Sequence, residues 1–147
     1  MDPDIKQVLR RAFPGEEARY FKPMSVGSDA ATADQGAAAI LDGTKTTTSS
    51  AFWEWPDGRL PKVGDLSVLL DGQRRARAII ETTRIEIIPF GSVDERLAWS
   101  YGEGDRTLRW WRMAIGAFYR EAAARHGTSF SDETSLIFEW IAVARLL

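Results

Sequence analysis

The hydrophobic positions of this chain recur with two spacings, one typical of helices and the other of strands. Between Leu108 and Ala122 they fall three or four residues apart, the period of an amphipathic helix, and Gly127 is the expected end of that helix. Apolar positions over 66–70 and 76–88 instead alternate with polar ones, which is typical of strands. The complete pattern predicts helices over 3–14, 30–41, 93–101 and 108–126, and strands over 44–55, 66–70, 76–88 and 138–146.

Capping residues mark where two of these helices begin and end. Asp2-Pro3 is an expected N-cap with proline in the first turn, and the first helix is expected to end near Pro14-Gly15. Asp29 is the expected N-cap of the second helix, and Gly43 is its expected C-terminal stop. The segment between the two helices, which runs through Lys22-Pro23, is interpreted as a linker.

The order of these elements indicates the fold class. Helices come first, then a run of strands, then helices and a closing strand, and this order favours an α+β fold over a parallel α/β sheet. We expect a small β-barrel surrounded by α-helices. A chain of 147 residues fits one domain, spanning 1–147, and a hydrophobic fraction of 44% with 27% charged residues is typical of a folded protein.

Composition excludes several kinds of site. The chain has no cysteine, which excludes disulfides, thiolate metal sites, iron–sulfur clusters and a catalytic thiol. The N-terminus is acidic where a secretory signal would be basic, and the apolar runs are short, so we expect a cytoplasmic protein with no membrane partner. The net charge of −2 means that binding to nucleic acid would depend on a local basic patch.

The strongest candidate site is the segment 43–50, Gly-Thr-Lys-Thr-Thr-Thr-Ser-Ser, in which hydroxyl side chains surround Lys45. A lysine crowded by polar, uncharged neighbours loses its proton more readily than one in water, and the hydroxyls could hold it near a substrate oxygen. The alternative is an edge strand in which threonines favour β structure and the lysine prevents edge pairing. The spacing alone slightly favours the edge strand. The segment 43–50 also lacks the glycine spacing of a phosphate-binding NTPase loop, so ATP is not expected as a ligand.

Two acidic residues precede the long helix in Tyr101-Gly102-Glu103-Gly104-Asp105. Glu103 and Asp105 could hold a divalent cation or supply a general base. Asp105 also suits the N-cap of a helix that starts near Arg106, and we favour that role, whereas the structural and functional interpretations of Glu103 stay equally open. Because the chain has one histidine and no cysteine, a bound metal would be magnesium or manganese held by oxygens.

Arginine and tryptophan cluster at the start of the long helix, as Arg106, Arg109, Trp110, Trp111 and Arg112. Arginine pairs with phosphates and indole stacks on bases, so this composition is typical of a surface that binds single-stranded nucleic acid. The alternative is a solvated helical face. Trp111 shares the apolar face of the helix and is expected in the core.

Several motifs, in their order along the chain, resemble the ASCH domain family of the PUA-like superfamily. They are Gly27-Ser28-Asp29 with Ala33-Asp34, the segment 43–50, Leu60-Pro61-Lys62-Val63-Gly64-Asp65, Ile88-Pro89-Phe90 with Val93-Asp94, Gly102-Glu103-Gly104-Asp105 with Leu108 and Trp111-Arg112, and Phe138-Glu139. The resemblance covers nearly the whole chain. It implies a small β-barrel with surrounding helices, a cleft lined by the Gly-x-Lys-Thr-x-Thr segment, and a role in RNA or nucleoside metabolism.

The resemblance also implies two activities. Some family members look like metal-assisted ribonucleases that act on single-stranded RNA. Smaller members are amidohydrolases that remove acyl groups from the exocyclic nitrogen of cytidine with a Lys, a Thr three residues later, and a Glu. By position, that lysine is Lys45 and that threonine is Thr48. Relatives usually read Glu-Gly-Glu-Gly-Asp where this chain has Tyr101 first, so Glu103 would supply the acid; this departure places the ribonuclease ahead.

The leading hypothesis is therefore a metal-assisted endoribonuclease on single-stranded RNA. Arg109 and Arg112 would bind phosphates, and Lys45 would neutralise charge on the scissile phosphate. Manganese or magnesium would be held by three carboxylates, those of Asp65, Glu103 and Asp105.

Two further hypotheses use the same residues. In an amidohydrolase that deacylates N4-acylcytidine-type nucleosides without a cofactor, Lys45 is nucleophile or base, Thr48 its hydrogen-bond partner and Glu103 the proton carrier. In a non-catalytic module, Lys45 and the arginines only recognise RNA or nucleotide. Thr46, Ser49 and Ser50 are expected to contact the substrate. The sequence does not indicate an oligomeric state.

Overall fold

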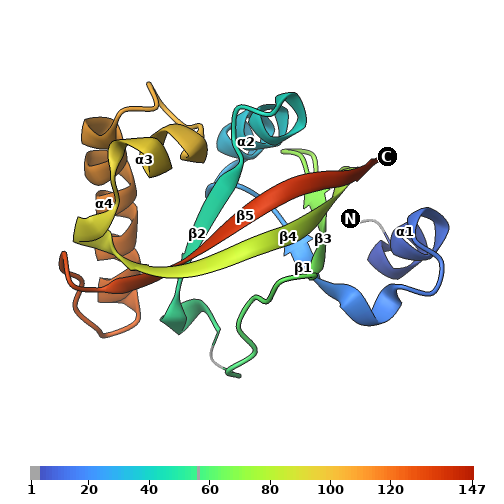
Figure 1. Cartoon of the computed structure of the whole chain (residues 1–147), viewed down its shortest axis with the longest axis horizontal. Helices are drawn as coiled ribbons and strands as arrows, with labels where there is room; N and C mark the ends of the chain where they lie inside the picture. The colour runs from blue at the N-terminus through green and yellow to red at the C-terminus, as the bar shows by residue number, and fades with distance from the viewer. Residues whose placement is uncertain (1–3, 56) are drawn as a thin grey trace.

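The computed structural model describes residues 4–55 and 57–147. Within them the chain forms a five-stranded sheet in the order β1-β3-β4-β5-β2, with four α-helices around it (Figure 1). The strands are β1 (Tyr20–Met24), β2 (Thr47–Ala51), β3 (Leu66–Leu70), β4 (Ala76–Pro89) and β5 (Ser135–Leu146), and the helices are α1 (Ile5–Ala12), α2 (Ala30–Asp42), α3 (Glu95–Tyr101) and α4 (Leu108–Arg125). The α+β class predicted from the sequence is confirmed.

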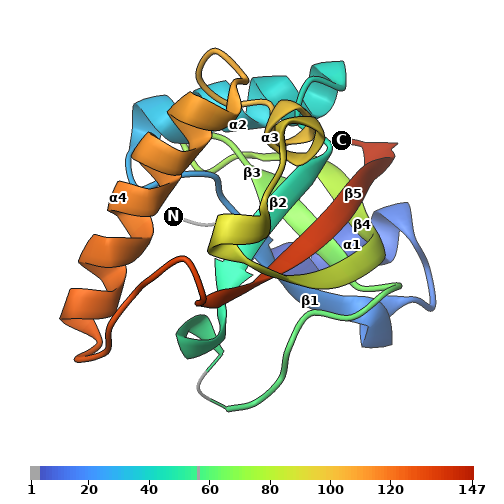
Figure 2. The ribbon, with the colours of Figure 1, turned by 60° about the vertical axis from the view of Figure 1, so that its left-hand side comes forward.

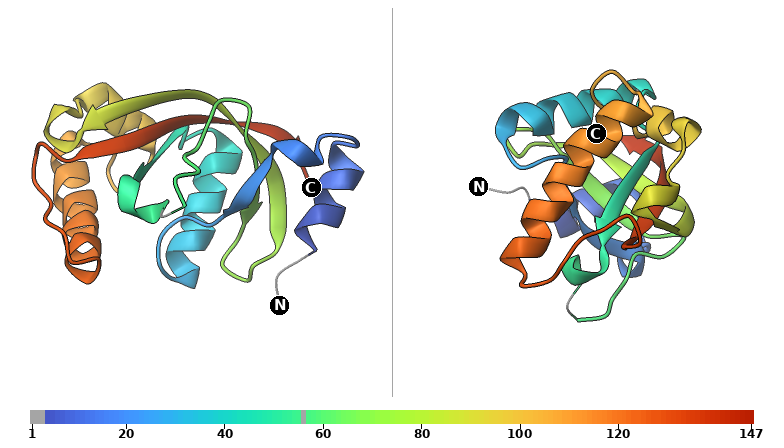
Figure 3. Two further views of the ribbon diagram at one scale, coloured as in Figure 1. Left: turned by 90° about the horizontal axis from the view of Figure 1, so that it is seen from below. Right: turned by 90° about the vertical axis from the view of Figure 1, so that its left-hand side faces the viewer.

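The long strands β4 and β5 form the central ribbon of the sheet. They are antiparallel and stay paired from Ala78 opposite Leu146 to Pro89 opposite Ser135. The register shifts at two places, between Ile79 and Ile80 and near Thr82, and such irregularities bend a strand. Seen from below, the two strands arch over α2, with α4 at one end and α1 at the other (Figure 3).

The sheet is not closed into a barrel, which corrects the sequence-based prediction. β1 pairs in parallel with β3, and β2 pairs antiparallel with β5, so β1 and β2 are the two edges of the sheet. Closure requires hydrogen bonds between the edge strands, and none joins these two among the described residues. The side chains that line the space between the two edges form the candidate site.

β1 occupies the segment predicted as a linker. Its second-last residue, Pro23, cannot donate a hydrogen bond to a neighbouring strand, and proline is therefore confined to edge strands or strand ends. Pro23 lies opposite Val68 on β3. The position of β1 at an edge of the sheet is consistent with this restriction.

Helices cover both faces of the sheet near β3. Leu66, Val68 and Leu70 pack with α1 on one face, whereas Leu69 packs with Ile40 of α2 on the other. This is the period-two alternation expected of a strand that is buried on both sides. Figure 2 shows α2, α3 and α4 along one side of the molecule.

An aromatic core joins α3 and α4 to the end of β5. Trp111 stacks on Phe90 with ring centroids 5.1 Å apart, and Phe138 and Tyr119 belong to the same buried cluster. The prediction that Trp111 lies in the core is confirmed. The cluster fixes α4 against the strand that carries Glu139.

Several predicted boundaries differ from the structure. α1 begins after the N-cap Asp4 and ends at Ala12, and the predicted cap Asp2-Pro3 lies outside the described residues. Residues 52–54 form a 3-10 turn instead of continuing β2, and Pro56, which follows the predicted strand, lies outside the described residues. The N-cap of α4 is Thr107 rather than Asp105, because the Thr107 hydroxyl accepts from the Trp110 amide.

Candidate functional site

Lys45 lies in the short connection between α2 and β2. The preceding helix ends at Gly43, whose φ of +85° is the left-handed conformation of a C-cap. The Lys45 side chain is fully buried. Its Nζ donates to the backbone oxygen of Tyr101 at 3.0 Å and to Oε2 of Glu103 at 2.6 Å, and it lies 3.6 Å from the centre of the Tyr101 ring. The amine is therefore held behind the ring of Tyr101 by the loop after α3.

Gly102 allows that loop to approach Lys45. It is the left-handed C-cap of α3, with φ +67°. A Cβ at this position would lie 2.5 Å from the backbone oxygen of Thr44 and 2.6 Å from Cα of Lys45. Only glycine fits both this conformation and this approach. The glycine between Tyr101 and Glu103 therefore sets the contact of Glu103 with Lys45.

Burial changes the acid–base chemistry of Lys45. Removal from water disfavours the ammonium form and lowers the pKa of Lys45, and the nearby Glu103 carboxylate partly opposes this by stabilising the charge. The Glu103 side chain is 24% exposed, whereas the Lys45 side chain is 0% exposed. Glu103, and not Lys45, is the member of the pair that reaches the neighbouring cavity.

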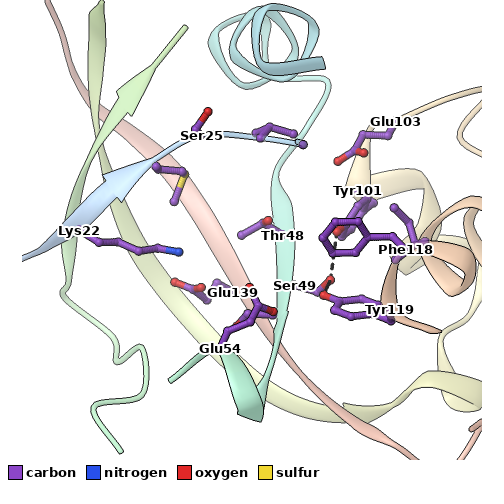
Figure 4. Close-up of a pocket in the computed structure, with 15 residues that line it drawn as sticks. Lys22, Ser25, Thr48, Ser49, Glu54, Tyr101, Glu103, Phe118, Tyr119 and Glu139 are labelled. Atoms are coloured by element: carbon purple, nitrogen blue, oxygen red, sulfur yellow. Dashed lines mark hydrogen bonds between the residues drawn. The ribbon is translucent and has the colours of Figure 1, made fainter. Parts of the chain in front are cut away.

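A cavity of about 210 Å³ opens between the edge strands β1 and β2. Thr48 and Ser49 of β2 line it, with Tyr101, Tyr119 and Glu103 beside them (Figure 4). Ser49 Oγ lies 3.0 Å from the hydroxyl of Tyr101 and 2.7 Å from that of Tyr119, which fixes both rings. We call this cavity the edge pocket.

Thr48 presents an available hydroxyl to the edge pocket. Its side chain lines the cavity, and among residues 4–55 and 57–147 its Oγ1 has no hydrogen-bond partner. The neighbouring hydroxyls of Ser49 and Ser50 are engaged, the latter by the indole N–H of Trp55 at 3.1 Å. Thr48 is therefore the hydroxyl of β2 that is free to bind a ligand.

Lys22 and Glu139, which the sequence analysis did not single out as site residues, also line the edge pocket. Glu139 lies opposite Thr48 in the β2–β5 ladder and is 3% exposed. Its Oε1 accepts from the Thr82 hydroxyl at 2.9 Å, and burial raises its pKa. Burial lowers the pKa of Lys22, whose Nζ lies 4.5 Å from the centre of the Trp55 ring. The sequence contained one signal for Glu139, namely a charged residue inside the apolar run that forms β5.

A family model described as ASCH domain matches residues 22–145. The chain belongs to the ASCH domain family. It is similar to the ASCH domain of Lactobacillus crispatus JV V101, at 26% identity and a TM-score of 0.86 over 98% of this chain and 96% of that one. It is also similar to a protein from Enterococcus faecalis V583, at 28% identity and a TM-score of 0.77 over 85% of this chain and 76% of that one. The comparison with curated proteins gave no match.

The arginines predicted to bind substrate lie outside the edge pocket of this ASCH domain. Both guanidinium contacts of Arg112 go to Asp132, through one nitrogen at 3.1 and 3.2 Å from the two carboxylate oxygens. Arg109 is exposed on α4. Thr46 is exposed as well, and its amide donates to the backbone oxygen of Ser100 at 2.8 Å. These residues and the pocket belong to different surfaces.

The carboxylates predicted to hold a metal ion do not converge. The described part of this ASCH domain contains no group of three histidine or acidic residues that could hold a metal. Asp65 is buried and accepts two hydrogen bonds from the Arg59 guanidinium, and Asp105 accepts from the amide and hydroxyl of Thr107. Glu103 is paired with Lys45. The predicted set does not fit a metal ion in this arrangement, and the requirement for manganese or magnesium stays a prediction.

The length and composition of the helices bear on whether one could span a membrane. None of those within the described ranges combines the length and apolar character needed to cross a bilayer. The cytoplasmic location inferred from the sequence stays a prediction.

Proposed function

We propose that this ASCH domain is an amidohydrolase that removes an acyl group from the exocyclic amine of a nucleoside of the N4-acylcytidine class. The observation that carries the proposal is the Lys45–Glu103 pair at 2.6 Å, with the free hydroxyl of Thr48 in the same pocket. These are the residue types that the family resemblance implies for the reaction. Glu103 contacts the lysine even though Tyr101 occupies the place of the first acid in relatives.

The charges around the edge pocket support a neutral substrate. Glu54, Glu103 and Glu139 line it, and Lys22 is the single cationic residue among those that line it. An excess of carboxylates repels phosphate and attracts hydrogen-bond donors such as amides and amines. The small volume suits one ring and its substituent better than a length of RNA.

The chemistry is a hydrolysis in which Glu103 transfers protons. Glu103 takes a proton from water, and the hydroxide adds to the acyl carbonyl carbon. The hydroxyl of Thr48 donates to the oxyanion that forms on the carbonyl oxygen. The carbon–nitrogen bond then breaks as Glu103 returns the proton to the leaving amine, which yields a carboxylic acid and the free amino group. Water supplies the hydroxyl group of the acid and the proton of the amine, so the reaction needs no cofactor.

Lys45 acts on this reaction through Glu103. Its amine is buried behind Tyr101 and donates to Glu103, which holds the carboxylate at the pocket wall. Lys45 is a positioning residue in this arrangement, and a role as nucleophile would require the amine to leave its buried position.

Three variants and one control test the proposal. The assay measures the release of the acyl group from N4-acetylcytidine, and chromatography quantifies the cytidine that forms. Glu103→Gln removes the proton carrier, and we expect kcat to fall by about 10²–10⁴-fold. Thr48→Val removes the oxyanion donor, and we expect a fall of about 10²-fold. Lys45→Met should lower kcat while KM changes little, because the lysine does not contact substrate. Lys62→Met changes an exposed lysine outside the pocket and is the matched control.

Retention of full activity in Glu103→Gln would contradict the proposed chemistry. A rise of KM in Lys45→Met, with kcat unchanged, would instead show that the lysine binds substrate directly. Melting temperatures of all four variants distinguish these results from loss of the fold.

A second candidate function, binding of single-stranded RNA, rests on a different surface. Trp99 is 59% exposed, and the guanidinium of Arg106 lies 3.7 Å from the centre of its ring. Exposed indole and guanidinium planes stack on bases. Trp99→Ala is expected to weaken the binding of a labelled single-stranded RNA by about fivefold or more, and equal binding would contradict this candidate.

A further inference from the structure

Two polar groups at one end of the edge pocket have hydrogen-bonding capacity that the described residues do not use. In the parts of the chain that the structure describes, Nζ of Lys22 makes no hydrogen bond or ion pair, and Oε2 of Glu139 accepts none. Both side chains line the cavity and both are drawn toward it in Figure 4. The Lys45–Glu103 pair does not involve either residue.

Partial removal from water affects the acid–base chemistry of both groups. Burial shifts the pKa of Lys22 downward and that of Glu139 upward, toward the neutral forms. Perturbed titratable groups that line a cavity are characteristic of ligand-binding sites. The hydrogen-bonding capacity of this pair is therefore available to a ligand.

The strand register places this pair beside the proposed reaction centre. Thr48 and Glu139 are directly opposite residues on adjacent antiparallel strands, so their side chains lie on the same face of the sheet. Lys22 reaches the cavity from β1, the other edge strand. Thr48 and Glu139 thus present a hydroxyl and a carboxyl group from one side of the cavity, and Lys22 presents its amine from the other.

We propose that Lys22 and Glu139 form a recognition subsite for a pyrimidine ring, in which Lys22 binds the ring carbonyl oxygen and Glu139 binds the adjacent ring nitrogen. This inference rests on the proposed function and names its specificity residues. In cytosine, the exocyclic nitrogen, the ring nitrogen N3 and the carbonyl oxygen O2 follow one another along a single edge. With the acylated nitrogen near Thr48 and Glu103, N3 and O2 extend toward Glu139 and Lys22.

The aromatic residues of the pocket provide the surfaces for a planar ring. Tyr101 and Tyr119 are held by Ser49, and Phe118, which is 44% exposed, lies near them at the same cavity (Figure 4). Aromatic side chains bind flat rings through their faces and edges.

The protonation state of Glu139 determines whether the subsite distinguishes cytosine from uracil. Its Oε1 already accepts from Thr82, so Oε2 is the atom left to contact a ligand, and burial raises the pKa of Glu139, which favours the protonated form. A protonated carboxyl donates to N3 of cytosine, which has no hydrogen, whereas N3 of uracil is itself a donor. Lys22 donates to O2 in both bases. The subsite therefore selects cytosine over uracil through Glu139 and binds both through Lys22.

Calorimetric titration with cytidine and with uridine tests the inference, because neither nucleoside carries an acyl group and neither reacts. Lys22→Met keeps the length of the side chain beside Trp55 and removes the ammonium group; we expect affinity for both nucleosides to fall by about tenfold. Glu139→Met removes the donor to N3, so we expect the preference for cytidine over uridine to disappear. Glu139→Gln, with its carbonyl oxygen on Thr82 and its amide N–H toward the ligand, should keep the preference. Lys62→Met and Glu133→Gln, two exposed positions outside the pocket, are the matched controls.

Equal affinities in Lys22→Met and Lys62→Met would overturn the subsite, as would an unchanged preference for cytidine in Glu139→Met. A general loss of folding would lower the affinity for both nucleosides together and would not remove the preference between them. If the wild type deacylates N4-acetylcytidine while these variants bind as the wild type does, the subsite alone is wrong. If the wild type neither binds cytidine nor deacylates N4-acetylcytidine, the proposed function fails as well.

Discussion

At the scale of single residues, the edge pocket contains charges that the fold itself does not require. Lys45 is fully buried and satisfied by Glu103 and by the backbone oxygen of Tyr101. Glu139 has one oxygen satisfied by Thr82 and the other directed to the cavity. Replacement of a group retained for ligand binding often increases stability, because binding sites are not optimised for folding alone.

The pH dependence of stability tests this view of Glu139. A raised pKa means that the folded state binds the proton more tightly than the unfolded state, so ionisation of Glu139 costs stability as pH rises above its ordinary value of 4.5. Glu139→Gln keeps an acceptor for Thr82 and cannot ionise. We expect the variant and the wild type to melt alike at pH 4, and the variant to melt higher at pH 8. Thermal denaturation at both values measures the difference, and a variant that melts lower at pH 8 would contradict it.

At the scale of elements, the loop between α3 and α4 determines whether the acid meets the lysine. Gly102 combines a left-handed conformation with a backbone contact to the Thr44–Lys45 segment. Gly127, at the end of α4, has nearly the same φ, +69°, but a Cβ there would meet nothing within 4 Å. The two glycines separate the effect of conformation from that of close approach.

Alanine substitution of these glycines gives a matched comparison. Gly127→Ala should cost about 1 kcal/mol for the left-handed conformation alone. Gly102→Ala adds the clash with Thr44 and should cost on the order of 3 kcal/mol. We also expect Gly102→Ala to reduce N4-acetylcytidine hydrolysis beyond what its stability explains, because Glu103 moves away from Lys45. Urea unfolding measures the loss in free energy of unfolding for each variant. Equal losses would show that the close approach of Gly102 to Thr44 does not affect stability.

The elements also show what a sequence can and cannot predict here. Local signals were sufficient for α2, because Asp29 and Gly43 are its caps, and for the helical period of α4. β1 was missed because its pairing with β3 is non-local and because Pro23 is typical of a loop. Lys45 stood out through its hydroxyl neighbours. Glu139 did not stand out, because a charged side chain within an apolar strand can point to solvent or into a pocket. Only the pairing of the strands in the folded sheet determines which of these occurs.

At the scale of the whole molecule, the open edge of the sheet is the basis of the site. Closure of this sheet into a barrel would join β1 to β2 and close the space in which Lys22, Thr48 and Glu139 meet. Closure depends on pairing between strands that are far apart in the sequence, so the order of elements alone could not exclude it. The surface at Trp99 that we propose as an RNA-binding candidate and the edge pocket are formed by different residues, which allows each to be tested alone.

The charge of the molecule sets a preference among substrates. The net charge is −2, and the carboxylates of Glu54 and Glu103 line the edge pocket against the single lysine Lys22. A 5′-phosphate on the acylated nucleoside should be repelled, so we expect kcat/KM for N4-acetylcytidine 5′-monophosphate to be roughly threefold lower than for the nucleoside at low salt. Salt screens this repulsion, and the difference should narrow at 0.5 M sodium chloride. A phosphate that raises kcat/KM would contradict the electrostatic argument.

The most direct test of the central claim is the release of cytidine from N4-acetylcytidine by the wild-type protein in the presence of a chelator. The Lys45–Glu103 pair and Thr48 require no metal for the proposed hydrolysis, so the expected result is cytidine and acetate in equal amounts, at the same rate with and without the chelator. Absence of cytidine, together with manganese-dependent shortening of a single-stranded RNA by the same preparation, would contradict the proposed amidohydrolase and favour a metal-assisted ribonuclease.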